Sequence, residues 1–283
     1  MRAISTPDEI AHLLKTVKKK DKAIGLVPTM GALHPGHFEL IRRCQAENDV
    51  TVVSIFVNPI QFDKQEDLDN YPRNTEEDLA QLEVLGVNYV FTPEVTHLYP
   101  SKPQVTINFG SLGEVMEGAF RKGHFDGVGI VVGKLLNIIQ PTSAYFGMKD
   151  LQQYLLVKQM CADLSFPTKI IGVETVREEN GLAMSSRNKR LSSQGLVVAS
   201  NLFKGLQIIG DEVKGEKTPQ ELIEQANDFY HAIEGLEIEY LQLFNGRTLT
   251  PAKSFDEINE LAICVAGYVE GVRLIDNLYL RLK

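Results

Sequence analysis

The segment that most constrains the fold is Val50–Val57, a nearly continuous run of β-branched residues. A strand that is apolar on both sides belongs in a sheet that is covered on both faces. Shorter apolar segments alternate with helical ones along the first part of the chain. Strands are predicted at Ala23–Val27, Tyr89–Phe91, Ala144–Phe146 and Lys169–Val173, and helices from Thr6 to the Lys18–Lys20 cluster and at Pro35–Glu47, Glu76–Leu85, Asp126–Ile139 and Leu151–Cys161. This alternation predicts a parallel α/β sheet.

The pattern changes after about Val176. Helices are predicted near Ser193–Ile209 and Pro219–Ile233, followed by β-like runs at Glu237–Phe244 and Leu261–Ala266. We therefore expect an α/β protein with a Rossmann-like parallel-sheet domain over residues 1–176 and a smaller α+β domain over residues 177–283. The boundary is expected within Glu174–Gly181.

Composition excludes several classes of protein. The 283 residues are 43% hydrophobic and 23% charged, which is ordinary for a globular protein, and the net charge of −8 argues against broad nucleic-acid binding. Cys44, Cys161 and Cys264 lie far apart in apolar segments, which favours buried, reduced thiols over a metal site. The N-terminus has no signal-peptide pattern and no apolar stretch could span a bilayer, so we expect a soluble, cytoplasmic protein.

A loop with two histidines follows the first predicted strand. In Val27-Pro-Thr-Met-Gly-Ala-Leu-His34-Pro-Gly-His37, Pro28 ends the apolar run and Gly31 permits a tight backbone. Pro35 suits a first helical position, which places His34 just ahead of the helix and His37 in its first turn. Free N–H groups and the helix dipole favour an anion there. Each histidine alone could be a surface cap, but the pair predicts a nucleotide-handling loop.

Polar side chains follow the Val50–Val57 run. Asn58 and Gln61 offer neutral donors and acceptors that suit a small polar substrate, although an Asn-Pro turn with a solvated glutamine is the competing interpretation. Farther on, Glu76, Glu77 and Asp78 are most simply explained as a capped, solvated first helical turn, and a carboxylate that helps to hold Mg²⁺ is the weaker alternative.

A third polar stretch runs from Arg121 to Gly127. Its two cations and His124 precede a helix start, which is compatible with an anion contact. The glycines at 127, 129 and 133 have the wrong spacing for a dinucleotide fingerprint, so close helix packing explains them better.

Two further stretches carry cations at loops. Gly147-Met148-Lys149-Asp150 follows a predicted strand, so Lys149 could neutralise phosphate, and Gln153 could face the same pocket one turn later. Met184-Ser185-Ser186-Arg187 combines two hydroxyls with a guanidinium and can clamp phosphate as charge develops. Taken with the histidine loop, these stretches indicate ATP.

These motifs in combination resemble one family. His34-x-Gly-His37 with Met184-Ser-Ser-Arg187 is similar to the paired signatures of the nucleotidylyltransferase and class I aminoacyl-tRNA synthetase superfamily. The remaining motifs resemble those of the pantothenate synthetase (pantoate–β-alanine ligase) family: Asn58-Pro-x-Gln61-Phe62, Tyr71-Pro-Arg73, Gly123-His-Phe125, Lys149-Asp150-x-Gln152-Gln153 and Met184-Ser-Ser-Arg187-Asn188. One departure is Met148, where the family pattern carries glutamate.

The resemblance implies a ligase that condenses (R)-pantoate with β-alanine. Pantoate would attack the α-phosphate of Mg·ATP to give pantoyl adenylate and pyrophosphate, and β-alanine would then displace AMP to give pantothenate. Catalytic roles are implied for His37, His34, Lys149 and Arg187, and substrate roles for Gln61 (pantoate and β-alanine) and Gln153 (pantoate). The implied ATP-binding residues are Met30, Gly31, Ala32, Leu33, His34, Pro35, Gly36, His37, Gly147, Met148, Lys149, Asp150, Val176, Met184, Ser185, Ser186 and Arg187.

The family further implies Mg²⁺ with ATP, a homodimer, and a second domain that acts as a lid against water. The metal ligands are not implied. A nucleotidylyltransferase for a phosphorylated acceptor shares the histidine loop but needs more basic residues beside Asn58, Gln61 and Gln153. A tRNA synthetase is disfavoured by the short, acidic chain. A non-catalytic nucleotide-binding regulator is disfavoured by the intact histidines, Lys149 and Arg187.

Overall fold

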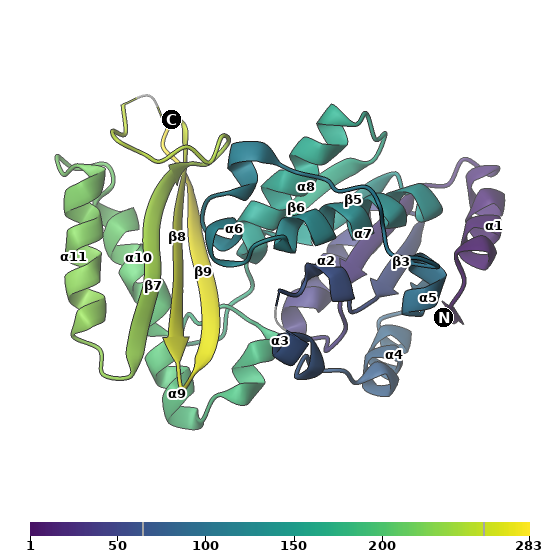
Figure 1. Cartoon of the computed structure of the whole chain (residues 1–283), viewed down its shortest axis with the longest axis horizontal. Coiled ribbons are helices and arrows are strands. Elements are labelled where there is room, and N and C mark those ends of the chain that lie inside the picture. The colour runs from purple at the N-terminus through teal and green to yellow at the C-terminus, as the bar shows by residue number, and fades with distance from the viewer. Residues whose placement is uncertain (64, 257) are drawn as a thin grey trace. The chain divides into compact units, whose positions relative to one another are not determined.

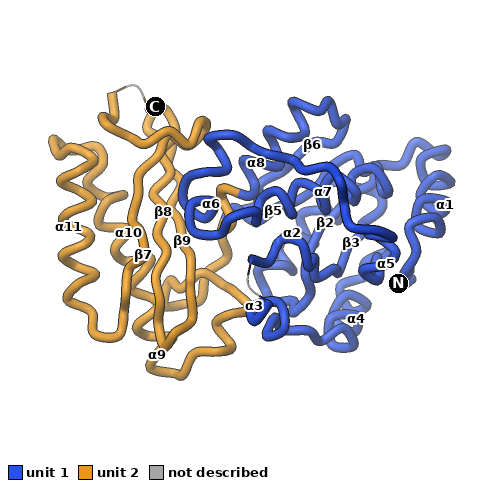
Figure 2. The backbone as a smooth tube through the Cα atoms, in the orientation of Figure 1, with its two compact units in different colours: residues 1–148, 153–174 blue, residues 149–152, 175–283 orange. Residues whose placement is uncertain are grey.

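The first sheet has six strands in the order β1-β4-β3-β2-β5-β6, and all neighbouring pairs are parallel. The computed structural model describes residues 1–63, 65–256 and 258–283. The chain divides into two units (Figure 2): unit 1 comprises Met1–Met148 and Gln153–Glu174, and unit 2 comprises Lys149–Gln152 and Thr175–Lys283. The strands of unit 1 are β1 Arg2–Ile4, β2 Ile24–Thr29, β3 Val50–Ile55, β4 Tyr89–Phe91, β5 Ser143–Gly147 and β6 Lys169–Val173.

Helices separate these strands along the chain (Figure 1). They are α1 Pro7–Lys18, α2 Pro35–Glu47, α3 Gln65–Asp69, α4 Thr75–Val84, α5 Val95–Leu98, α6 Glu117–Phe120, α7 His124–Ile139 and α8 Leu151–Asp163. Short 3₁₀ turns lie at η1 Pro59–Gln61, η2 Gly110–Gly113 and η3 Met148–Asp150.

Both faces of this sheet are covered, as the apolar β3 run predicts. Leu26 and Val52 pack into a core with residues of α1, α7 and α8, whereas Val27 and Val53 pack with residues of α2 and α4. Successive residues of a strand point to opposite faces, so each pair of neighbours supplies both cores. All six residues of β3 are buried.

The order in which the chain adds strands to the sheet changes direction at β2. This strand pairs with β3 on one side and with β5 on the other, so the chain reverses its direction of progress across the sheet between β2 and β5. In open parallel sheets, ligands bind beyond the carboxyl ends of the strands at such a switch point. The loops that follow β2, β3 and β5 therefore belong to the expected binding edge.

Unit 2 is built on an antiparallel sheet in the order β7-β8-β9. Its strands are β7 Leu236–Asn245, β8 Glu260–Val269 and β9 Val272–Arg281, and its helices are α9 Ser193–Ala199, α10 Asn201–Glu212 and α11 Pro219–His231, preceded by a 3₁₀ turn η4 Ser186–Arg190. Alternate β8 residues Leu261, Ile263 and Val265 pack with the helices in one core. Thr218 and Glu221 form a reciprocal capping box at the start of α11.

The predicted Rossmann-like α/β class, with a smaller α+β part, is confirmed, and several predicted boundaries are wrong. Strands β1 and β9 were not predicted. The predicted Ser193–Ile209 helix is two helices that meet at Ser200, and α7 begins at His124 rather than at Asp126. Thr6 precedes α1 but makes no side-chain capping hydrogen bond.

Pro28 does not end its strand. It pairs with Ser54, and β2 continues to Thr29. A proline is tolerated because β5 pairs only with Gly25 and Leu26, so β2 has a single neighbour where the N–H is missing.

Cys44, Cys161 and Cys264 are all buried, as predicted, and burial raises the pKa of the Cys44 and Cys161 thiols to about 11. Within the described ranges, no helix combines the length and apolar character that crossing a bilayer requires.

Candidate active site

The histidine loop leaves the carboxyl end of β2 through two left-handed residues. Gly31 has φ 82° and Ala32 has φ 49°, a conformation that is readily available to glycine and unusual for alanine. The Thr29 hydroxyl donates to the Ser54 carbonyl (2.8 Å) and accepts from the Gly31 N–H (3.2 Å). The turn is therefore fastened to β3 before it enters α2.

His34 is the N-cap of α2, and His37 lies in its first turn, as predicted. The His34 Nδ1 accepts from the Gly36 N–H at 3.2 Å. Because Nδ1 is the acceptor, the neutral ring carries its proton on Nε2, which makes Nε2–H a donor. The His34 and His37 ring centroids are 4.0 Å apart. The pair thus lies together at a helix N-terminus.

A buried carboxylate holds the same loop from behind. Asp78 accepts from the Ala32 N–H at 2.9 Å and from the Leu33 N–H at 2.8 Å, and its residue is only 2% exposed. The interpretation of Asp78 as a solvated first-turn acid is therefore wrong, although Glu76 and Glu77 are exposed as expected. A Cβ on Gly31 would lie 2.9 Å from the Asp78 carboxylate, so a larger residue at 31 would crowd this contact.

The amides after β3 are buried and bonded to each other. Asn58 is 1% exposed and Gln61 is 6% exposed, so the solvated-glutamine interpretation is wrong. The Asn58 Nδ2 donates to the Gln61 Oε1 at 3.2 Å and to the Gly127 carbonyl at 3.0 Å. The Gln61 Nε2 donates to the Met30 Sδ at 3.0 Å, which connects this turn to the histidine loop.

The start of α7 packs tightly on the same turn. The His124 Nδ1 lies 2.8 Å from the Gln61 carbonyl oxygen, and a Cβ on Gly127 would lie 2.5 Å from the Ile60 carbonyl oxygen. Close packing thus explains Gly127, as predicted. It does not explain Gly133, where a Cβ would meet nothing within 4 Å. Arg121 contacts His124 and Glu117, so these basic groups serve the protein's own contacts.

Lys149 lies in η3, immediately after β5 ends at the half-buried Gly147. Its Nζ is 4.0 Å from an Asp150 carboxylate oxygen, and its side chain is 19% exposed. Its carbonyl accepts from the Asn277 Nδ2 at 2.8 Å, so β9 fixes the backbone at the lysine. Gln153 is half-buried in the first turn of α8.

The predicted serine and arginine clamp is a short 3₁₀ turn. The Ser185 side chain caps η4 by accepting from the Arg187 N–H at 3.3 Å, and the Asn188 Nδ2 donates to the Ala183 carbonyl at 3.1 Å. The Met184 N–H donates to the Val176 carbonyl at 2.9 Å, so these two predicted ATP-binding residues are neighbours in space.

A buried ion pair supports this turn. Arg177 donates to both carboxylate oxygens of Asp276, at 2.7 and 3.0 Å, and its guanidinium lies 3.6 Å from the centre of the Phe203 ring. It also donates to the Gly181 carbonyl at 3.0 Å. Burial raises the pKa of the Asp276 carboxyl, and the bonds from Arg177 oppose that rise.

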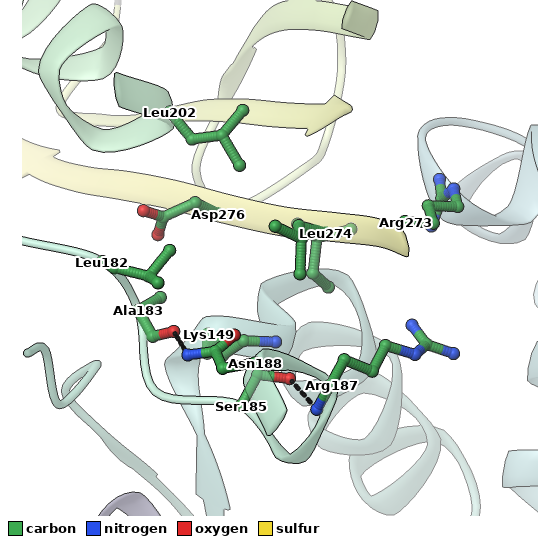
Figure 3. A pocket seen from close by; sticks show the side chains of 11 residues that line it. Lys149, Leu182, Ala183, Ser185, Arg187, Asn188, Leu202, Arg273, Leu274 and Asp276 are labelled. Atoms are coloured by element: carbon green, nitrogen blue, oxygen red, sulfur yellow. Dashed lines mark hydrogen bonds between the residues drawn. The ribbon is translucent and has the colours of Figure 1, made fainter. Parts of the chain in front are cut away.

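Lys149, Ser185 and Arg187 line one pocket with Arg273 and Asp276 (Figure 3). All of these residues belong to unit 2. The structure therefore brings together three of the predicted phosphate-binding residues within that unit, while His34 and His37 pair within unit 1.

A resident metal ion would need a cluster of donor side chains. Across the described residues, no group of three or more His, Cys, Asp or Glu side chains could hold a metal ion. Mg²⁺ commonly takes one or two carboxylates and completes its shell with substrate phosphates and water. The residues present fit an ion that arrives with a nucleotide better than a fixed protein-bound ion.

Sequence reasoning missed three residues that shape these loops, Tyr99, Arg177 and Asp276, and misassigned a fourth, Asp78. Tyr99 donates to the Asn58 Oδ1 at 3.0 Å. Each of the four acts across a separation of 41 residues or more, counting Asp78 to Ala32, Tyr99 to Asn58 and Arg177 to Asp276. A local motif carries no signal for such pairs, so only the fold reveals them.

Known proteins of one family are similar to this chain over nearly its whole length. The family model described as pantoate-beta-alanine ligase matches residues 2–279. A pantothenate synthetase from Cytophaga hutchinsonii is 44% identical over 283 residues, which are 100% of both chains. A pantothenate synthetase from Bacteroides fragilis is 40% identical and covers 98% of each chain.

Solved structures agree with the sequence relatives. Pantothenate synthetase from Thermus thermophilus superposes with a TM-score of 0.92 at 40% identity, over 98% of this chain and 99% of that one. A pantoate–β-alanine ligase from Francisella tularensis, complexed with Beta-gamma ATP and β-alanine, gives a TM-score of 0.81 at 36% identity, over 98% and 97% of the two chains.

The fold and these relatives define a Rossmann-like enzyme of the ligase class. The chain belongs to the pantoate–β-alanine ligase family. The predicted family, enzyme class and reaction, ATP-dependent condensation of pantoate with β-alanine in pantothenate biosynthesis, are confirmed.

Proposed function

We propose that this ligase works through a pantoyl adenylate made at the histidine loop. A pantoate carboxylate oxygen attacks the α-phosphorus of ATP and pyrophosphate leaves. The β-alanine amine then attacks the acyl carbonyl carbon, AMP leaves, and the amine gives up a proton. The observation that carries this proposal is the pair of histidines at the N-terminus of α2, because the first step requires donors that offset repulsion between two anions.

The two histidines have different parts in this proposal. The His34 Nδ1 accepts from the Gly36 N–H, so its Nε2–H is the group proposed to donate to a phosphate oxygen. His37 is the proposed catalytic histidine that stabilises the charge developing on the phosphates. Met30–His37 forms the nucleotide-binding loop around them.

Two cations of unit 2 are proposed to contact phosphate. Lys149 and Arg187, which line one pocket with Ser185, are proposed to neutralise the departing pyrophosphate. The hydroxyls of Ser185 and Ser186 are proposed to assist them. Gly147, Met148 and Asp150 flank the lysine, and Val176 is proposed as a backbone contact beside Met184.

Neutral amides suit the pantoate subsite. Gln61 and Gln153 are proposed to hold pantoate, with Gln61 also near β-alanine, because an amide orients hydroxyl and carboxylate oxygens without adding charge. The burial of Gln61 supports this role, because a buried amide has little access to water as an alternative hydrogen-bond partner.

Mg²⁺ is proposed to enter as the counterion of ATP, where it would neutralise phosphate charge. Asp150, whose side chain is 51% exposed, is the carboxylate within the predicted ATP-binding residues and is a candidate to contact the hydrated ion. Further proposals are a cytoplasmic homodimer and a lid role for residues 177–283. Sedimentation at assay concentration tests the dimer.

One assay tests the proposed function. The purified chain should form AMP and pantothenate in equal amounts from ATP, pantoate and β-alanine, and with β-alanine omitted it should release pyrophosphate up to one equivalent per site. Release of ADP and phosphate instead would exclude the adenylate route.

The Gln61→Ala variant tests the substrate assignment. Loss of a buried hydrogen-bonding amide should raise the KM for pantoate by about 10-fold or more, while the KM for ATP stays near the wild-type value. Initial rates with each substrate varied in turn measure both constants. An equal loss in both constants would overturn the assignment of Gln61 to pantoate.

A further inference from the structure

A buried hydrogen-bond chain lies behind Gln61. Tyr99, just past the end of α5, is 9% exposed, and its hydroxyl donates to the Asn58 Oδ1 at 3.0 Å. Asn58 donates in turn to the Gln61 Oε1 at 3.2 Å. All three residues belong to unit 1. Burial raises the pKa of the Tyr99 hydroxyl, so that group stays protonated and donates.

The direction of this chain is set by a group that cannot donate. The Gly127 carbonyl only accepts, and it lies 3.0 Å from one end of the Asn58 amide, so that end must be the NH₂ group. The other end is then the oxygen, which faces the Tyr99 hydroxyl. With its two N–H groups directed to Gly127 and Gln61, the Asn58 amide has one orientation.

The fixed Asn58 orients Gln61 in the same way. Because Asn58 presents an N–H, the facing atom of Gln61 must be Oε1, and the Gln61 Nε2 must lie at the opposite end, where it contacts the Met30 Sδ at 3.0 Å. The Gln61 backbone is held as well, since its carbonyl oxygen is 2.8 Å from the His124 Nδ1. One of the two Nε2 hydrogens is used by the sulfur, which leaves the other for a ligand.

We propose that Tyr99 is a positioning residue that locks the Asn58 and Gln61 amides, so that Gln61 presents an N–H donor to an acceptor oxygen of pantoate. The inference rests on the proposed substrate role of Gln61 and goes beyond it by assigning the polarity of the contact. A donor at this point favours a substrate with a carboxylate or hydroxyl oxygen there and disfavours one with an ammonium group.

A tyrosine is suited to this position because its surroundings hold the ring in place. The Tyr99 ring centroid lies 6.1 Å from that of Phe56, and the Lys134 Nζ lies 5.5 Å from the Tyr99 ring centroid. Replacement by phenylalanine keeps these contacts and removes one donor. Asn58 cannot compensate by flipping, because its oxygen would then face the Gly127 carbonyl.

The Tyr99→Phe variant of the full chain tests the proposal. We expect the KM for pantoate to rise by about 5- to 10-fold, the scale of one ordinary hydrogen bond, with the KM for ATP within about 2-fold of wild type. Tyr230→Phe is the matched control. Tyr230 is a fully buried tyrosine of unit 2 whose hydroxyl donates to the Leu202 carbonyl at 2.7 Å, so its variant loses one hydrogen bond without touching the amides.

Thermal melts of both variants separate positioning from stability. The two are expected to lose similar Tm, and only Tyr99→Phe should lose pantoate affinity. Wild-type pantoate kinetics in Tyr99→Phe would overturn the proposal, and so would a pantoate defect of the same size in Tyr230→Phe.

A double mutant distinguishes this inference from the substrate role on which it rests. If Tyr99 acts through Gln61, adding Tyr99→Phe to Gln61→Ala should cause no further rise in the pantoate KM, and full additivity would overturn the inference. If Gln61→Ala alone leaves the pantoate KM unchanged, the substrate role fails first. If Gln61→Ala impairs pantoate use while Tyr99→Phe does not, only the positioning inference fails.

Discussion

The two loops proposed to bind phosphate are each held by a buried aspartate, and they are held differently. The histidine loop of unit 1 is bound directly, because Asp78 accepts the backbone N–H groups of Ala32 and Leu33. The Ser185–Arg187 turn of unit 2 is supported indirectly, because Asp276 binds Arg177, which itself pairs with Ala183 in the segment before the turn.

Asp78 and Asp276 differ in the groups that offset their buried negative charge. Asp78 relies on neutral N–H dipoles that exist only while the loop keeps its left-handed turn, so the carboxylate and the loop conformation stabilise each other. Asp276 has a guanidinium partner that also bonds the Gly181 and Asn277 carbonyls. We therefore expect Asp276 to govern the stability of unit 2 and Asp78 to govern the shape of a binding loop.

The largest expected effect is on stability. Asp276→Ala should lower the free energy of unfolding by about 3 kcal/mol, because it leaves the half-buried Arg177 without its carboxylate. Urea denaturation measures the loss. Glu212→Ala is the control, since Glu212 pairs with Lys217 at the surface and its loss should have little effect on stability. Equal losses in the two variants would contradict a special role for the buried pair.

The next largest effect is on the rate of adenylate formation, and it distinguishes the functions of the two loops. His37→Ala should reduce adenylate formation by roughly 100-fold or more, the scale for losing one key transition-state donor. Ser185→Ala in the second loop removes one of two neighbouring hydroxyls and should cost only about 10-fold. Single-turnover pyrophosphate release measures both rates. Near-normal turnover in His37→Ala would remove that histidine from the mechanism.

The smallest effect concerns the shape of the histidine loop. Asp78→Asn keeps one acceptor but turns an NH₂ group toward the second backbone N–H, so the KM for ATP should rise by about 5- to 10-fold while the KM for β-alanine changes little. Glu76→Gln, on the exposed side of the same turn, is the matched charge control. An unchanged KM for ATP would show that the loop keeps its conformation without the carboxylate.

The sequence predicted the parts of this molecule in which local pattern and fold agree. The buried β3 run, α2 with its His34 cap, and Lys169–Val173 were placed correctly because apolar period and capping chemistry are local. The missed strand β9 has alternate apolar residues from Val272 to Leu280, interrupted at Asp276 by a charge. That charge is compatible with an inward position only because Arg177, 99 residues away, pairs with it.

Contacts between distant segments also explain the errors in the candidate site. The sequence identified Asn58 and Gln61 as substrate amides but left a solvated turn open, because their burial depends on Gly127 and His124 of a distant helix. Asp78 was assigned wrongly because exposed and buried first-turn acids look identical in sequence. The assignments of individual residues to ATP and pantoate stay predictions.

The course of the chain through the two units has a consequence for dissecting the enzyme. Lys149–Gln152 is grouped with Thr175–Lys283, although β5 precedes it and the rest of α8 follows it in unit 1. A gene divided at residue 175 would therefore place Lys149 on one fragment and Asn277, which donates to the Lys149 carbonyl, on the other. Proteins that are split or domain-exchanged at residue 175 should lose the Asn277 hydrogen bond that holds the Lys149 backbone, even when both halves fold.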